Sequence, residues 1–165
     1  MTIDTPRETE RAAVPRRGEP IPSFSGRTPE GRRIGTRDFY MRRNLALVFT
    51  HGPECDACRT LLRELAAREP AVQAEAGETL AVIPGEPVAV SAMSEGVPFP
   101  VVVDGDLAIH QRYGLIDADG KPRAAIFAVD RYGTIFEPSL ADAGHAMMTA
   151  AEVPGWLEFI ACRCS

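Results

Sequence analysis

Two pairs of closely spaced cysteines are the residues of this chain whose type and spacing could carry out chemistry. Two residues separate Cys55 from Cys58, and one residue separates Cys162 from Cys164. Thiolates attack electrophiles, exchange with disulfides and bind soft metal ions. The four cysteines therefore predict either redox chemistry or a metal site.

The positions of Cys55 and Cys58 predict unequal roles. Apolar residues at 58, 61, 62 and 65 have the spacing of an amphipathic helix, and Cys58 belongs to that stripe. Cys55 lies at the solvent-facing start of the helix, where free N–H groups and the helix dipole favour a thiolate. The i, i+3 spacing places both sulfurs on one helix face, within reach of a disulfide. We predict Cys55 as the attacking thiol and Cys58 as its sheltered partner, in preference to two small hydrophobic residues.

The histidines are weaker candidates. His51 lies four residues before Cys55 and could give or take a proton beside the thiolate, although it could also simply line the loop. His110 and His145 have no neighbours at metal-ligand spacing, so we expect both at the surface or at helix ends.

Three alternatives stay open for Cys162 and Cys164. A disulfide between them would be strained, because a single residue separates them. This tail could swing to Cys55 and resolve a disulfide there, or it could complete a four-thiolate zinc site with Cys55 and Cys58. Both could also be incidental terminal thiols. In the redox interpretation, none of these residues holds a metal ion.

The elements that position Cys55 begin with residues 44–50. This uninterrupted apolar segment is typical of a strand buried on both faces, hence central in a sheet. A short loop at 51–54 leads into the cysteine-bearing helix. We expect Pro70 to interrupt this helix and Gly77 to end whatever continues beyond it.

Strand and helix patterns then alternate along the chain. Asp104 could cap one of these helices, with Gly114 just past its end. Strands are predicted at residues 80–83, 100–103, 124–129 and 134–136, and helices at residues 87–94, 106–113 and about 153–160. The order predicts an α/β fold with a mixed sheet that ends in a hairpin and a terminal helix.

Composition limits the classes of function. With 165 residues, 45% of them hydrophobic, the chain can form one domain over residues 19–165. We predict that residues 1–18 form a disordered leader. Arginines alternate with glutamates in this segment, so we expect it to be solvated and not to bind nucleic acid. The start is not a secretory signal, and no apolar segment reaches the ~20 residues of a membrane helix. We therefore expect a cytoplasmic protein with no membrane partner. The sequence has no phosphate-binding glycine loop, and we expect no cofactor.

Residues 44–59 resemble the redox-active segment of the thioredoxin-like superfamily. The resemblance is nearest to the peroxiredoxin-related redoxins, the alkyl hydroperoxide reductase/thiol-specific antioxidant group. Further segments that resemble this group, in order and at suitable spacing, are residues 18–24, 99–104, 113–115 and 126–135.

The resemblance implies a thioredoxin-like fold, a central mixed sheet flanked by helices. It also implies a thiol-dependent oxidoreductase that reduces hydroperoxides as an antioxidant or exchanges protein disulfides through its Cys-x-x-Cys dithiol. The implied reductant is a thioredoxin-type protein or a small thiol. The resemblance is also compatible with assembly of this chain as a homodimer. The alternative is a non-enzymatic module on the same fold that binds zinc through cysteines or senses redox state.

The chain departs from the family pattern near its catalytic positions. Typical peroxiredoxins have a threonine three residues before the attacking cysteine, where this chain has Gly52; the nearest hydroxyl, Thr50, lies two residues further back. The family arginine corresponds to Ala124, and Arg123 one residue earlier could take its role of stabilising a thiolate or a bound peroxide.

Overall fold

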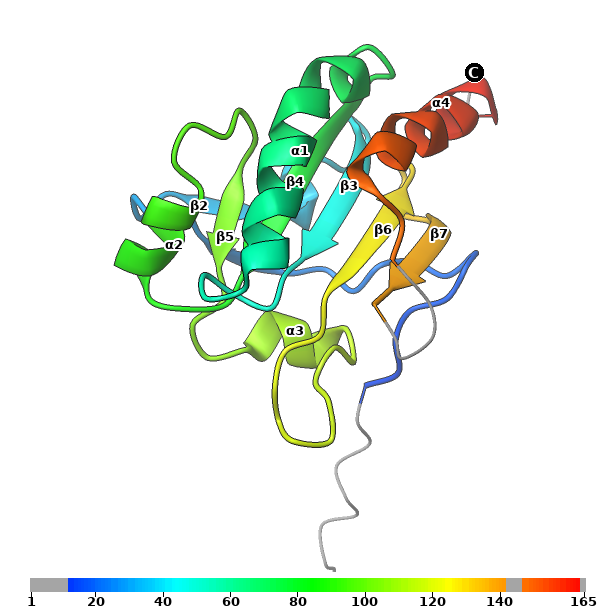
Figure 1. The fold of residues 1–165 in the computed structure, drawn as a ribbon. Helices are drawn as coiled ribbons and strands as arrows, with labels where there is room; N and C mark the ends of the chain where they lie inside the picture. The colour runs from blue at the N-terminus through cyan, green and yellow to red at the C-terminus, as the bar shows by residue number, and fades with distance from the viewer. Residues whose placement is uncertain (1–11, 142–146, 164–165) are drawn as a thin grey trace, which may run out of the picture.

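The computed structural model describes residues 12–141 and 147–163. In this part of the chain the strands form one seven-stranded sheet with the order β2-β1-β5-β4-β3-β6-β7 (Figure 1). The strands are β1 (Ser25–Arg27), β2 (Arg33–Gly35), β3 (Asn44–Phe49), β4 (Gly77–Ile83), β5 (Val101–Val103), β6 (Ala125–Val129) and β7 (Ile135–Leu140). The helices are α1 (Asp56–Gln73), α2 (Pro87–Met93), α3 (Ala108–Arg112) and α4 (Val153–Arg163), with short 3-10 turns at Thr36–Asp38 and Ala150–Glu152.

The strand that leads to Cys55 is central, as its apolar sequence predicts. All six residues of β3 are buried. The strand pairs in parallel with β4 and antiparallel with β6, so that Leu47 lies between Leu80 and Phe127. The sheet is therefore mixed, and the predicted α/β fold is confirmed.

Side chains of β3 alternate between two hydrophobic cores. Ala46 and Val48 face the core that α1, α2 and α4 cover, whereas Leu47 and Phe49 face a second core that contains residues of α3 and of the amino-terminal segments. Figure 1 shows α1 and α4 in front of the sheet and α3 below it. Helices and loops on both faces explain why this strand carries no polar alternation.

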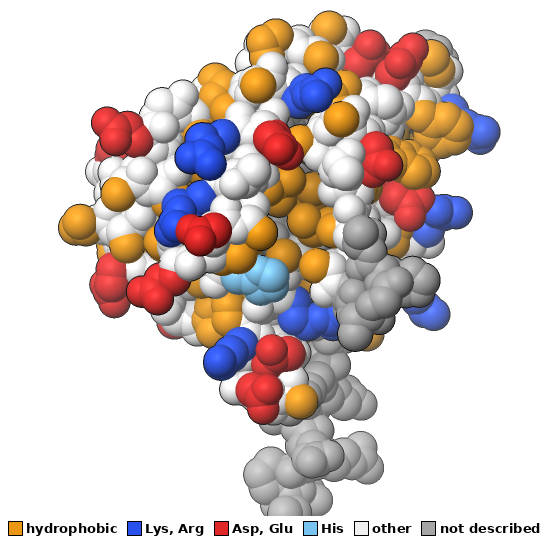
Figure 2. All heavy atoms as spheres, in the orientation of Figure 1, with side chains coloured by type: hydrophobic (Ala, Val, Ile, Leu, Met, Phe, Trp, Pro, Cys, Tyr) orange, Lys and Arg blue, Asp and Glu red, His pale blue; other side chains and the backbone are white. Residues whose placement is uncertain are grey.

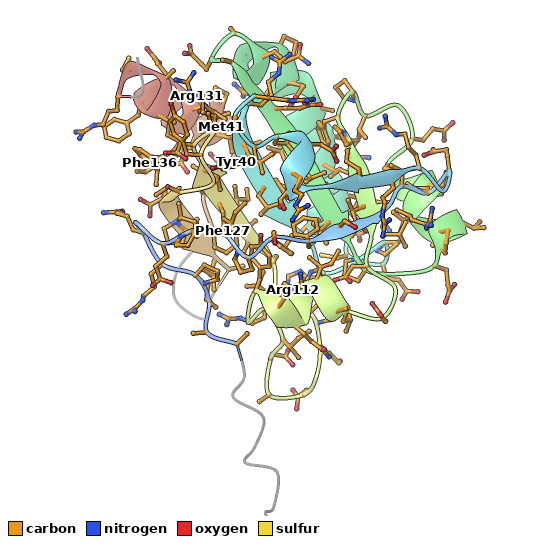
Figure 3. All side chains as sticks on the ribbon, turned by 180° about the vertical axis from the view of Figure 1, so that it is seen from behind. Tyr40, Met41, Arg112, Phe127, Arg131 and Phe136 are labelled. Carbon is orange, nitrogen blue, oxygen red and sulfur yellow. The ribbon has the colours of Figure 1, made fainter. Side chains whose placement is uncertain are left out.

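The amino end of β3 is tied to two loops. The Asn44 side chain donates to Glu75 O at 3.1 Å and accepts from the Arg131 N–H at 3.1 Å. The Met41 N–H donates to Arg131 O at 2.6 Å, and Figure 3 shows Met41 close to Arg131 on the back of the molecule. These bonds hold one end of β3, so that its other end delivers the Cys55 loop to a defined place.

The prediction that Pro70 interrupts the cysteine-bearing helix is wrong. Helix α1 continues through Pro70 to its last residues. The φ of proline is compatible with a helix, and its cost is one lost backbone hydrogen bond. Beyond Pro70, Val72 packs in the core. Glu69 accepts hydrogen bonds from Thr79 N (3.1 Å) and Thr79 Oγ1 (2.6 Å) of β4. These contacts hold the last turn, and Gly77 begins a strand instead of ending a helix.

The other predicted elements are found with boundaries shifted by a few residues. The Asp104 carboxylate accepts the N–H groups of Ile109 and His110, as a capping side chain does, although the N-cap residue of α3 is Leu107 and not the predicted Asp104. Gly114 follows this helix with a φ of +67°, and a side chain there would meet Ala12 O.

The predicted leader over residues 1–18 remains a prediction, because its first eleven residues lie outside the described residues. Within the part that is described, the Gly18 N–H donates to Ile135 O at 2.8 Å. Across the described ranges, no helix combines the length and the apolar character needed to cross a membrane.

Candidate active site

A tight loop between β3 and α1 presents Cys55. Gly52 has a φ of +128°, and the Cys55 N–H donates to Gly52 O at 3.2 Å. A β-branched threonine would be strained at this φ, which accounts for glycine where the family pattern has threonine. Cys55 itself is extended, with φ −89° and ψ 110°, and is the N-cap residue of α1. The predicted position at the start of the helix is therefore observed.

The Cys55 sulfur occupies the place of a capping oxygen. Cys55 Sγ accepts the Cys58 N–H at 3.4 Å, as the hydroxyl or carboxylate of an N-cap residue usually does. The Cys55 side chain is partly exposed, so a substrate can reach it.

Cys58 is the sheltered thiol. It is 3% exposed and packs on the inner side of α1. Burial raises the pKa of the Cys58 thiol to about 11, although the His51 N–H, which donates to its Sγ at 3.2 Å, opposes this shift. At neutral pH Cys58 is therefore a protonated thiol beside a more accessible one. The predicted inequality of the two cysteines agrees with this geometry.

His51 joins the two thiols. Its Nδ1 lies 3.6 Å from Cys55 Sγ and 3.5 Å from Cys58 Sγ. Its side chain is exposed, and histidine surface reaches solvent among hydrophobic side chains in Figure 2. A ring nitrogen between two sulfurs can take a proton from one thiol and return it to a leaving group. The structure thus brings His51, a secondary candidate by sequence, into direct contact with both cysteines.

Thr50 contributes through its backbone. Its carbonyl oxygen accepts a hydrogen bond from His110 Nε2 at 3.0 Å. Its hydroxyl is buried and has no hydrogen-bond partner among the described residues. Thr50 therefore links the site loop to α3, next to His51 in the chain.

Asp104 and His110 form a buried pair that sequence reasoning missed. Asp104 is 2% exposed and His110 is fully buried, so the expectation of a surface histidine is wrong, whereas its place in α3, a helix of five residues, agrees with the helix-end alternative. His110 Nδ1 lies 2.6 Å from Asp104 Oδ2. Although burial opposes the charged form, hydrogen bonds from the His110 ring and from the His110 and Ile109 amides hold the pKa of Asp104 below its ordinary value. The signal that could have found the pair is the helix cap itself, because a capping carboxylate reaches the first turn, where His110 lies.

Arg123 lies two residues before the start of β6. Its N–H donates to Leu115 O at 2.8 Å, and its charge contributes to holding the pKa of Asp117 below its ordinary value, after the larger effect of the Lys121 amide. Its action on a thiolate or peroxide remains a prediction.

Cys162 is exposed in the last turn of α4. In Figure 1 the end of α4 lies at the upper right of the molecule, away from the start of α1, which lies beside the carboxyl end of β3. Exchange with Cys55 of the same chain would therefore require α4 to move. Cys164, the second residue of this pair, lies outside the described residues.

Comparisons with known proteins agree with this architecture. The model of the AhpC/TSA family matches residues 17–137. Mycobacterium tuberculosis AhpC superposes with a TM-score of 0.73 at 19% identity, over 88% of this chain and 92% of that one. Enterococcus faecalis AhpC does so with a TM-score of 0.75 at 19% identity, over 90% and 95%. Reduced Plasmodium vivax 2-Cys peroxiredoxin does so with a TM-score of 0.75 at 14% identity, over 89% and 97%.

No curated protein matches the chain. At these identities the solved structures establish the fold, whereas the family model spans most of the chain and includes the complete Cys55 loop. The chain is a thiol oxidoreductase and belongs to the AhpC/TSA family.

Proposed function

We propose that this chain reduces hydroperoxides with Cys55 as the attacking thiol and Cys58 as the thiol that closes an intramolecular disulfide. One observation carries the proposal. The accessible Cys55 sulfur accepts the Cys58 N–H at the start of α1 and lies 3.6 Å from His51 Nδ1. A nucleophile, a proton carrier and a second thiol are therefore in mutual contact.

In the first step the Cys55 thiolate attacks the terminal oxygen of the hydroperoxide. The O–O bond breaks, Cys55 becomes a sulfenic acid, and the leaving alkoxide takes up a proton to form an alcohol. His51 is placed to remove the thiol proton beforehand and to return it to the leaving oxygen.

In the second step Cys58 attacks the sulfenic sulfur. Its thiol proton passes to the departing hydroxide, so water leaves and a disulfide remains. The two sulfurs already lie within 4.8 Å of each other, and both contact the same histidine nitrogen. A small adjustment of the first helical turn closes this gap to the bond length of a disulfide.

An external thiol then restores the site. A thioredoxin-type protein or a small thiol attacks the more accessible Cys55 sulfur, expels Cys58 as the leaving group and forms a mixed disulfide with Cys55. A second thiol attacks the reductant's sulfur in this mixed disulfide, so that Cys55 is released and the reductant leaves as a disulfide. The same accessibility supports a second candidate function, exchange with protein disulfides. The expected cytoplasmic location suits both, since thiols are kept reduced there.

Parallel assays of wild type and Cys55→Ser separate these activities. We expect Cys55→Ser to abolish hydroperoxide consumption in the presence of a dithiol reductant, and Cys58→Ser to accumulate a sulfenic acid that dimedone traps at Cys55. The control is the double variant Cys162→Ser/Cys164→Ser, which should retain consumption. Peroxide consumption that persists in Cys55→Ser would reject the proposal, and loss confined to disulfide reduction would favour the second function.

A further inference from the structure

We propose that the reduced site binds one Zn²⁺ ion through Cys55 Sγ, Cys58 Sγ and His51 Nδ1. The three ligand atoms lie within 4.8 Å of one another. Thiolate sulfur and imidazole nitrogen are the usual zinc ligands in proteins. This inference goes beyond the proposed function, because it requires no turnover of peroxide.

The separations of the ligand atoms suit a tetrahedral ion. Zinc lies about 2.3 Å from a thiolate sulfur and about 2.0 Å from a histidine nitrogen, so tetrahedral geometry places the two ligands about 3.6 Å apart. The observed distances from His51 Nδ1 are 3.6 Å to Cys55 Sγ and 3.5 Å to Cys58 Sγ. The separations of the histidine nitrogen from both sulfurs therefore match those that a shared zinc ion would require.

Backbone N–H groups already donate to both sulfurs. The His51 N–H donates to Cys58 Sγ at 3.2 Å, and the Cys58 N–H donates to Cys55 Sγ at 3.4 Å. Such N–H···S bonds orient thiolate ligands and spread their charge.

The site is open to solvent on one side. His51 is exposed and Cys55 is partly exposed, whereas Cys58 is buried. The ion would thus have three protein ligands and a fourth position for water or an external thiol, unlike a closed structural site. This ligand set differs from the four-thiolate alternative, because Cys162 belongs to the last turn of α4, which lies away from the start of α1 (Figure 1).

Zinc binding and the disulfide would exclude each other. The two thiolates that hold the ion are the same sulfurs that join in the disulfide. Oxidation of the dithiolate releases the ion: the zinc-bound pair, one hydroperoxide and two protons give the disulfide, one alcohol, one water and free Zn²⁺. The chain would therefore hold zinc when reduced and release it when oxidised.

Metal binding by the reduced full-length protein tests this inference. Zn²⁺ is titrated in competition with a chromogenic chelator, and Co²⁺ serves as a spectroscopic probe of tetrahedral thiolate coordination. We expect one ion per chain in the wild type and none after oxidation to the disulfide. Cys55→Ser and Cys58→Ser should lose the thiolate-to-cobalt absorption, and His51→Ala should weaken zinc affinity at least about tenfold.

The matched control is Cys162→Ser/Cys164→Ser, which should bind as the wild type does, and circular dichroism verifies that each variant is folded. The inference is overturned if the wild type binds no ion, if His51→Ala binds with unchanged affinity, or if the control loses the ion. Peroxide consumption is measured with chelator present, so a failure of the proposed function is read separately from a failure of metal binding.

Discussion

His110 Nδ1 lies 2.6 Å from Asp104 Oδ2 in the interior, while the other ring nitrogen donates to Thr50 O at 3.0 Å. Both ring nitrogens thus face acceptors, and a doubly protonated ring can donate to both. The pair connects the end of β5, helix α3 and the loop that carries His51 and Cys55. Because it is fully enclosed, it holds the site loop against the fold through charge-assisted hydrogen bonds.

Replacing His110 by alanine should destabilise the protein. The change leaves the Asp104 carboxylate buried without its partner and frees Thr50 O, and breaking a buried pair from one side typically costs about 3–5 kcal/mol. Urea denaturation of the reduced protein measures the loss. Gln111→Ala, at an exposed neighbour on α3, is the matched control and should change stability by less than about 0.5 kcal/mol. A loss for His110→Ala as small as that of the control would show that the pair does not hold the loop.

The Asp104–His110 pair should make the free energy of unfolding depend on pH in the acidic range. The pKa of Asp104 is lower in the folded chain than its ordinary value of 3.8. At pH values below 3.8 the unfolded chain therefore binds a proton that the folded chain does not, and the free energy of unfolding falls as the pH drops through the folded pKa. Asp104→Asn has no such carboxyl, so its stability should fall less steeply over this window. Denaturation curves at several acidic pH values, with Asp119→Asn as an exposed control, measure the difference. Equal slopes for wild type and Asp104→Asn would contradict the prediction.

Glu69 should show the opposite dependence. Burial raises the pKa of Glu69, although its hydrogen bonds from Thr79 oppose the shift. The folded chain then keeps a proton that the unfolded chain loses as the pH rises above 4.5, so stability should decrease with rising pH until the folded carboxyl ionises. Glu69→Gln retains an acceptor for the Thr79 N–H and can donate to the Thr79 hydroxyl, without a buried charge.

The stability of Glu69→Gln relative to wild type should therefore increase with pH across this window. Thermal or urea unfolding from pH 4 to 8 tests it, and Glu64→Gln on the exposed side of α1 is the control. A constant difference between Glu69→Gln and wild type would mean that Glu69 titrates alike in the folded and unfolded chains.

Local sequence patterns were sufficient to predict strand β3 and the proximity of the two thiols. The apolar run of β3 has no polar alternation because both of its faces are covered, and the i, i+3 spacing alone brings Cys58 to Cys55. In contrast, the importance of His51 depends on the turn at Gly52, whose φ of +128° folds the loop back over the helix start. Nothing in the local sequence specifies that fold of the loop.

Long-range contacts account for what the sequence could not predict. His110 is buried because its ring reaches Thr50 O, sixty residues earlier in the chain. Pro70 remains helical because Glu69 bonds to Thr79 of the neighbouring strand. In both places a polar side chain satisfies a partner on another element, and that pairing outweighs the local preference of the residue.

The two thiols should differ in their reaction with iodoacetamide. Cys58 is 3% exposed, and burial raises its pKa to about 11, so little of it is thiolate at neutral pH. In Cys55→Ser, alkylation of Cys58 at pH 7 should be slow and should accelerate steeply with rising pH, because burial, the largest cause of the raised pKa of Cys58, persists without the Cys55 sulfur. Mass spectrometry of the tryptic peptides follows each site separately, with exposed Cys162 as the internal reference for an accessible thiol. Alkylation of Cys58 at the rate of Cys162 near neutral pH would show that its thiol is neither sheltered nor held protonated, and Cys58 would then compete with Cys55 as the attacking thiol.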